Sequence, residues 1–216
     1  MRNTLTEENY LKALFHLADD DHKVTVNDLS KFLNVKMPTV NNMMKKFAEK
    51  QWVIYENYKP LIITESGMKE AALIVRKHRL TEMFLVEKMN FGWENVHEIA
   101  EQLEHVHSHL FFDKMDEILN FPTLDPHGEP IPDKDGNIIT QDVKKLSACK
   151  AGETVTFKAV TFSDDRFLNY LNERSIHLES ELTILKIENF DQSMQVEHQG
   201  KTEILSKTAT DKMLVR

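Results

Sequence analysis

The chain has 216 residues, of which 41% are hydrophobic, so it is long enough for two or three small domains with real cores. Its net charge is −8, it has one cysteine, and it has no run of about 18 apolar residues that would indicate a transmembrane helix. Because its first residues also lack the apolar stretch of a secretory signal, we expect a cytoplasmic protein without disulfides or a membrane partner.

Residues 1–64 predict three helices followed by a two-stranded hairpin, which is the order of a winged helix-turn-helix. The expected elements are a helix capped by Thr6, a short helix over 26–33 that begins after Thr25, a helix from Pro38 to about Lys50, and strands over 52–56 and 61–64. This part carries nine basic and eight acidic side chains, whereas residues 65–216 carry 18 and 27. The local charge therefore permits contact with DNA although the whole chain is acidic.

The third helix is the expected recognition helix. Its first turns are the part that reaches base edges in the major groove, and lysines further along it are placed for phosphates. A winged helix used only for protein contacts is the alternative. The candidate DNA-binding residues are Pro38, Thr39, Asn41, Asn42, Lys45 and Lys46.

The middle of the chain predicts helices over 65–89, 94–105 and 107–119, with acidic and imidazole side chains on their apolar faces. His78 and Glu82 share one face of the first helix, and the spacing of residues 97, 101, 104 and 105 places His97, Glu101, Glu104 and His105 on one side of the next. Such a set without cysteine fits a hard or borderline divalent metal. Salt bridges to Lys77 or Arg79 are the alternative, and so is a di-iron carboxylate site, because Glu94-x-x-His97 and Glu104-x-x-His107 have its spacing.

Residues 121–136 hold four of the six prolines and two of the six glycines, which predicts a loop and a domain boundary. Beyond it, strand patterns over 154–162, 181–188, 194–198 and 203–205 and a short helix over 164–172 predict a small, mostly β, barrel-like domain. The expected division is therefore 1–64, 65–142 and 143–216, in a mainly α protein with a small β domain.

Taken together, these motifs resemble the diphtheria toxin repressor family of metal-dependent transcriptional repressors, in particular its manganese-responsive three-domain members. The resemblance covers nearly the whole chain in order. The residues that carry it are Glu8-Asn9-Tyr10-Leu11-Lys12, Met37-Pro38-Thr39-Val40, Lys77-His78-Arg79-Leu80-x-Glu82-x-Phe84-Leu85, Val96-His97-x-x-Ala100-Glu101-x-Leu103-Glu104-His105, and Phe121-Pro122-x-x-x-Pro126-His127-Gly128-x-x-Ile131-Pro132.

The resemblance implies a homodimer with a helical metal-binding and dimerisation domain, a C-terminal SH3-like domain, operator DNA as partner and repression of metal-homeostasis genes. It also implies two metal positions per subunit. The primary one would use Asn9, Glu101, Glu104 and His105, with Glu8 as an alternative to Asn9. The second would use His78, Glu82 and His97 with Asp125 and His127 from the loop, and Asp164 or Asp165 of the last domain would extend it.

Iron-responsive relatives place a cysteine or methionine where Glu101 and Asn9 stand, and oxygen ligands favour manganese, with ferrous iron as the alternative. Manganese members usually carry aspartate at the position of Asn9, and some two-domain members use a glutamate as a ligand where this chain has Lys12. Without metal, we expect Glu101 and Glu104 to repel each other and to loosen the junction with the first helix. The rival functions are a metalloenzyme with an appended winged helix, for which no nucleophile or phosphate-loop motif exists, and a metal-free adaptor. We expect that the chain is not an enzyme.

Overall fold

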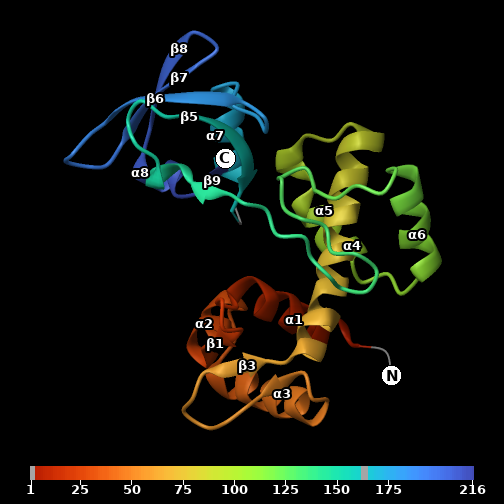
Figure 1. Cartoon of the computed structure of the whole chain (residues 1–216). Helices are drawn as coiled ribbons and strands as arrows, with labels where there is room; N and C mark the ends of the chain where they lie inside the picture. The colour runs from red at the N-terminus through yellow and green to blue at the C-terminus, as the bar shows by residue number, and fades with distance from the viewer. Residues whose placement is uncertain (1–2, 162–164) are drawn as a thin grey trace.

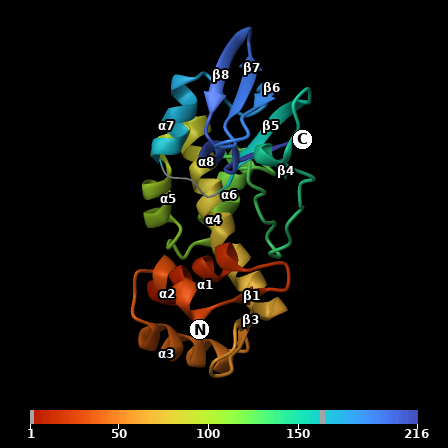
Figure 2. The same cartoon turned by 90° about the vertical axis from the view of Figure 1, so that its left-hand side faces the viewer.

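A computed structural model describes residues 3–161 and 165–216 (Figure 1). Figure 2 shows an elongated molecule with the N-terminal helices and hairpin at one end, a helical middle, and a sheet at the other end. None of the described helices is both long and apolar enough to cross a membrane. In chain order the elements are α1 Leu5–Leu17, β1 Lys23–Val24, α2 Val26–Phe32, α3 Met37–Glu49, β2 Val53–Ile54, β3 Leu61–Ile63, α4 Glu65–Met89, the 3-10 helix η1 Trp93–Asn95, α5 His97–Leu103, α6 His109–Ile118, β4 Lys144–Lys145, the 3-10 helix η2 Leu146–Ala148, β5 Thr154–Val160, α7 Asp165–Glu173, β6 Glu181–Ile187, β7 Met194–His198, β8 Lys201–Leu205, α8 Lys207–Thr210 and β9 Met213–Val215.

The N-terminal unit is a winged helix-turn-helix, as the sequence predicts. Its three strands form a small antiparallel sheet in the order β1-β3-β2, and its core is built from apolar side chains of all three helices. The predicted cap of α1 is wrong: the helix begins at Leu5 and Thr4 is its N-cap. Thr4 and Glu7 form a capping box, in which each side chain bonds the other's backbone N–H. The Thr4-x-x-Glu7 spacing carried this signal.

Helix α4 joins two units of the molecule. Ala71 and Ile74 in its first half pack in the winged-helix core, whereas Leu80 packs with Phe112 and Met115 in the core of the middle unit. The helix also contacts α1, α5 and α6. The polar residues of its inner face therefore lie where the first two units meet.

The helix predicted over 94–105 is divided in the structure. Residues 93–95 form η1, α5 ends at Leu103, Glu104 is its C-cap, and His105 lies beyond the helix. The prediction that His97, Glu101, Glu104 and His105 share one helical face is therefore wrong for His105. The imidazole instead lies against Glu8 of α1, with 2.6 Å between Nδ1 and Oε2. Helix α6 begins at His109 after the cap Ser108, two residues later than predicted.

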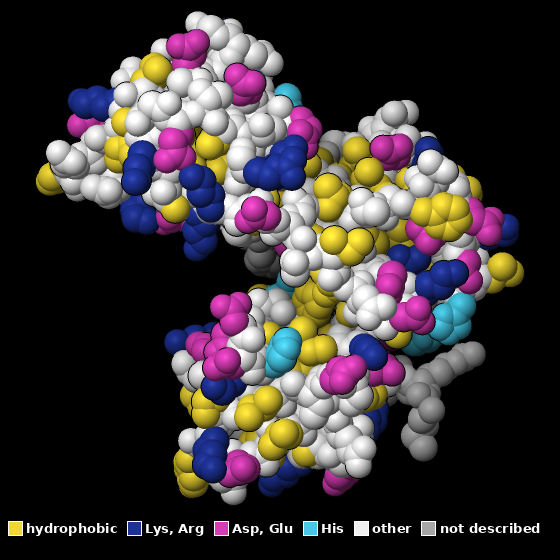
Figure 3. Space-filling model, viewed as in Figure 1, with side chains coloured by type: hydrophobic (Ala, Val, Ile, Leu, Met, Phe, Trp, Pro, Cys, Tyr) yellow, Lys and Arg dark blue, Asp and Glu magenta, His cyan; other side chains and the backbone are white. Residues whose placement is uncertain are grey.

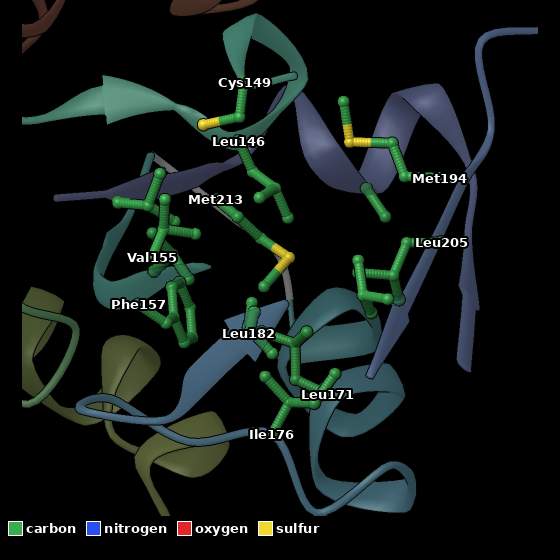
Figure 4. Packing of buried hydrophobic residues seen from close by; sticks show 14 of the residues in the cluster. Leu146, Cys149, Val155, Phe157, Leu171, Ile176, Leu182, Met194, Leu205 and Met213 are labelled. Carbon is green, nitrogen blue, oxygen red and sulfur yellow. The ribbon is translucent and has the colours of Figure 1, made fainter. Parts of the chain in front are cut away.

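The C-terminal unit is a six-stranded antiparallel sheet in the order β4-β9-β5-β6-β7-β8, and α7 and η2 complete its core. Figure 4 shows Leu146, Phe157, Leu171, Leu182 and Met213 converging on this core from strands and helices. The four predicted strand regions coincide with β5, β6, β7 and β8. Helix α7 packs on η1, where the Trp93 indole N–H donates to Asn172 at 2.8 Å, and this contact brings the last unit to the helical middle.

Candidate metal centre

The inner face of α4 provides the first part of a polar cluster. His78 and Glu82 lie one helical turn apart, both are buried, and Nε2 of His78 is 2.9 Å from Oε1 of Glu82. His97, the first residue of α5, places Nδ1 3.2 Å from the same imidazole nitrogen. Possible ligand atoms of His78, His97 and Glu101 all lie within 4.8 Å of one another. Two imidazoles and a carboxylate at this spacing suit a divalent cation.

The loop after α6 provides the second part. Possible ligand atoms of Glu82, Asp125 and His127 also lie within 4.8 Å of one another. Nε2 of His127 donates to the backbone oxygen of Trp93 at 2.8 Å, which leaves Nδ1 facing Glu82 at 3.6 Å. This second bond sets the tautomer of the imidazole, as is usual for a histidine that ligates a metal. Glu82 belongs to this second group, and its Oε1 also lies 2.9 Å from His78 and 3.3 Å from His97 of the first group, so it links the two.

Charge on the histidines balances the buried carboxylate. Burial lowers the pKa of His78, but the Glu82 charge and the hydrogen bonds with Glu104 and Glu82 outweigh burial and raise the pKa to about 9. Burial likewise opposes protonation of His127, and the bond and charge of Glu82 raise its pKa to about 9. The same partners hold the pKa of Glu82 well below its usual value against the effect of burial. In the absence of metal, protons therefore neutralise this cluster.

The carboxylate of Asp125 in the loop is held by backbone N–H groups, unlike that of Glu82, which is held by histidines. Oδ1 of Asp125 accepts the backbone N–H groups of His127 and Glu129, each at 2.9 Å. Burial, followed by the charges of Glu82 and Glu129, raises the pKa of Asp125 to about 7. Arg79 lies 3.5 Å from Asp125 and 2.9 Å from Glu129. The salt-bridge alternative thus applies to Arg79 and the loop, while the ammonium of Lys77 lies 3.7 Å from Glu8.

At the junction of α1 and α5, the expected repulsion between Glu101 and Glu104 is replaced by an ion pair. The Lys12 ammonium contacts Glu101 and lies 2.9 Å from each carboxylate oxygen of Glu104. Lysine and carboxylate are buried together, since 10% of the Lys12 side chain and none of the Glu104 side chain is exposed. Helix α1 thus places a positive charge between the two carboxylates, which opposes the repulsion expected between them.

The remaining residues expected at the primary position lie at this same junction. Glu8 holds Nδ1 of His105, so that Nε2 faces Glu104 at 3.8 Å. Oδ1 of Asn9 is buried without a hydrogen-bond donor among the described residues. A buried amide oxygen without a donor, on the helix whose Glu8 and Lys12 contact His105 and Glu104, fits a ligand for a hard cation.

A cavity of about 110 Å³ is lined by Lys12, His78, Glu82 and Glu101, and residues of all three units contribute to its wall. His16, which the sequence analysis missed, lines it, and burial together with the charges of Arg79 and Lys12 lowers the pKa of His16 to about 3. Asp165 of α7 also lines the cavity, whereas Asp164 lies outside the described residues. The di-iron alternative does not assemble, because Glu94 bonds Asn172 and His107 lies 3.8 Å from Glu8.

The expected DNA-binding residues lie on α3 at the end of the molecule farthest from the C-terminal sheet (Figures 1 and 2). Pro38, Thr39, Asn42 and Lys45 are exposed and Asn41 is half-buried. Lys46 is exposed as well, but its ammonium lies 3.1 Å from Glu7 of α1, and that of Lys50 lies 2.5 Å from the same carboxylate oxygen. Helix α1 thus contacts the recognition helix through Glu7 and the metal cluster through Glu8 and Lys12.

Comparison with known families and proteins covers the whole architecture. Residues 4–61 match the iron-dependent repressor N-terminal DNA-binding domain, residues 64–133 match the iron-dependent repressor metal-binding and dimerisation domain, and residues 144–216 match the FeoA domain.

Among curated proteins, the chain is 32% identical over 127 residues to the iron-dependent repressor IdeR of Mycobacterium tuberculosis, a match that covers 59% of this chain and 55% of that protein. It is 30% identical over 115 residues to the HTH-type transcriptional regulator MntR of Bacillus pumilus, covering 53% of this chain and 77% of the relative. The chain thus spans about half the length of the IdeR relatives.

Solved structures match over nearly the full length. A manganese-dependent transcriptional repressor in complex with manganese has 32% identity and a TM-score of 0.88, with 97% of this chain and 98% of that chain covered. ScaR with bound Zn²⁺ has 29% identity and a TM-score of 0.82, with 97% and 98% covered.

Proposed function

The chain belongs to the iron-dependent repressor family, and we propose that it is a metal-dependent, DNA-binding transcriptional repressor that controls genes of metal-ion homeostasis. The observation that carries this proposal is the position of the cluster. Acidic and imidazole groups of α4, α5 and the 121–136 loop converge beside α1, and α1 is part of the winged helix.

We infer two metal positions per subunit. The first uses Asn9, Glu101, Glu104 and His105, and Asn9 is favoured over Glu8 because Glu8 already orients the His105 ring. The second uses His78, Glu82 and His97 with the loop residues Asp125 and His127, and Asp165 is the described residue of the last unit that lines the shared cavity.

The residues of these positions are divided between the winged helix, the middle unit and the loop that follows it. Asn9 belongs to α1, whereas Glu104 and His105 follow α5, so shared ligation holds the winged helix against the middle unit. A bound dication supplies positive charge that several carboxylates can share at once. It changes the DNA-competent population only by its differential affinity for that state, and operator DNA must tighten metal binding by the same factor.

A homodimer would place two recognition helices on half-sites about 34 Å apart or a multiple of it. Apolar side chains exposed over the middle unit support such an assembly (Figure 3). The exposed fractions of Leu110 and Ile118 on α6 are 69% and 55%, and that of Phe121 after it is 61%. Large apolar side chains that gather on one surface are typical of protein interfaces.

Mn²⁺ is the proposed ion and Fe²⁺ is the alternative. The candidate ligands are carboxylates, an amide and imidazoles, and Cys149 is buried in the core of the C-terminal unit. Oxygen-rich ligand sets without thiolate suit manganese, although availability in the cell also decides which ion binds.

The test is binding of the metal-free protein to its own upstream DNA, measured by fluorescence anisotropy with Mn²⁺, Fe²⁺, Zn²⁺ or chelator. The proposal expects tight binding with Mn²⁺ or Fe²⁺ and weak binding with chelator, and loss of this dependence in the double variant Glu104→Gln with His105→Ala. Equal binding with and without metal would instead favour the metal-free adaptor.

A further inference from the structure

The buried ammonium of Lys12 lies among the carboxylates proposed as metal ligands. Lys12 projects from α1, contacts Glu101, and lies 2.9 Å from both oxygens of Glu104. These pairs join residues 89 and 92 positions apart in the sequence. The junction therefore contains a cation that belongs to the protein itself.

We propose that Lys12 competes with the metal ion for Glu101 and Glu104 and so sets the metal concentration at which the protein responds. This inference rests on the proposed function, because it assigns a role to Lys12 at the first metal position.

The competition follows from the charges. An ammonium within about 3 Å of the same oxygens as a dication would be strongly repelled, so metal binding requires Lys12 to move away. Its departure breaks a buried ion pair, which costs free energy that is subtracted from the affinity for the metal. Lys12 also lines the shared cavity, which gives the displaced side chain a place to go.

Lys77, a second lysine near this junction, carries the same charge as Lys12 but contacts different groups. Lys77 is also largely buried, but its ammonium lies 3.7 Å from Glu8 and donates to the backbone oxygen of Glu104 at 3.1 Å. Its contacts thus involve the Glu8 carboxylate and a backbone oxygen, whereas those of Lys12 involve the carboxylates of Glu101 and Glu104. Lys77 therefore provides a matched control for removal of one buried positive charge.

The alternative is that Lys12 only stabilises the packing of α1 against α5 through a structural ion pair. In that case its removal lowers stability without strengthening metal binding. In our proposal removal lowers the stability of the metal-free protein and raises the affinity for metal, because Glu101 and Glu104 then lose the ammonium that competes for them. The stability of the metal-free protein and the affinity for metal change in opposite directions only if Lys12 competes with the metal.

The experiment is calorimetric titration of the metal-free full-length protein with MnCl₂, together with thermal unfolding in chelator and in excess Mn²⁺. Lys12→Met is expected to raise the Mn²⁺ affinity about tenfold or more and to lower Tm in chelator, with the loss recovered by Mn²⁺. Lys12→Arg, which keeps the charge, and Lys77→Met are expected to stay within about threefold of wild type. In a Glu101→Gln background, Lys12→Met should give a smaller gain, since one contested carboxylate is gone.

An unchanged or weaker Mn²⁺ affinity in Lys12→Met would overturn the inference, and so would an equal gain in Lys12→Arg. These results leave the proposed function standing as long as the wild-type protein binds Mn²⁺. If neither wild type nor variant binds Mn²⁺, the proposed function fails first and the inference with it.

Discussion

At the α1–α5 junction, a lysine from the DNA-binding unit pairs with Glu101 and Glu104, and His78 adds a second partner for Glu104, whereas between α4 and the 121–136 loop Glu82 is neutralised by histidines. Both regions hold buried carboxylates without a metal, but the cations differ in chemistry. A lysine ammonium cannot ligate while it is charged, while an imidazole becomes a ligand as soon as it loses its proton. In the two-site arrangement that we propose, a metal therefore displaces a lysine side chain in the first region and releases protons from histidines in the second.

The largest effect is expected from Glu82→Gln, because Glu82 belongs to one group of possible ligands and contacts His78 and His97 of the other. Removal of its charge should lower the Mn²⁺ affinity of the α4–loop region about 100-fold or more. Calorimetric titration measures this affinity, and Glu87→Gln, on an exposed part of the same helix, is the matched control. Unchanged affinity in Glu82→Gln would mean that the histidine-rich region is not a metal site.

The pH dependence of Mn²⁺ binding provides the second test of the difference between the two regions. The pKa values of His78 and His127 are raised to about 9, so both histidines carry protons at neutral pH. Because metal needs neutral imidazole, Mn²⁺ affinity should rise about tenfold per pH unit for each proton released between pH 7 and 9. Titration in buffers of different ionisation enthalpy counts these protons, and a count of zero would contradict the comparison.

The same shifts predict the opposite trend for the metal-free protein. A raised histidine pKa stabilises the fold fully below the unfolded value of about 6.5 and loses this contribution as the pH rises through about 9. Thermal unfolding in chelator should therefore show Tm falling between pH 7 and 9. Substitution of His78 by glutamine should flatten that slope.

A third prediction concerns the loop. Gly128 follows His127 with φ of +84°, and a Cβ there would lie 2.1 Å from the backbone oxygen of Lys158 in β5. Gly128→Ala should displace Asp125 and His127 and so weaken Mn²⁺ binding about tenfold. The ion pairs of Lys12 should not change. Gly152→Ala is the control, since its φ is +89° but no atom lies within 4 Å of the added carbon. Equal weakening of Mn²⁺ binding in the two variants would show that backbone strain at the glycine, and not the close contact with Lys158, causes the loss.

The smallest effect is expected at the other end of α1. Glu7 neutralises Lys46 and Lys50 of the recognition helix, and these bonds hold the pKa of Glu7 at about 2 in spite of burial. Glu7→Gln should free positive charge for phosphates, strengthen metal-free binding to nonspecific DNA about threefold, and steepen its salt dependence by about one unit. Anisotropy over a salt series measures both values, with Glu49→Gln as control. Weaker binding would indicate that Glu7 positions α3 rather than screening it.

Much of the architecture could be read from the sequence because local patterns determine it. Periodicity and end signals predicted the winged helix, the long helix over Glu65–Met89 and the strands of the last unit. The resemblance and the family matches agree over the same three segments. Thr4, and not the predicted Thr6, is the N-cap of α1, so this helix begins two residues earlier than predicted.

The identities of the acidic and imidazole candidates, and the helix faces of His78 and Glu82, were likewise local properties that the sequence alone determined. Tertiary structure alone decided that Lys12 meets Glu101 and Glu104, that His105 leaves its helix for Glu8, and that Glu7 binds Lys46. Electrostatic pairing depends on separations of a few ångströms, and here those separations join side chains as many as 97 positions apart, which no sequence spacing encodes.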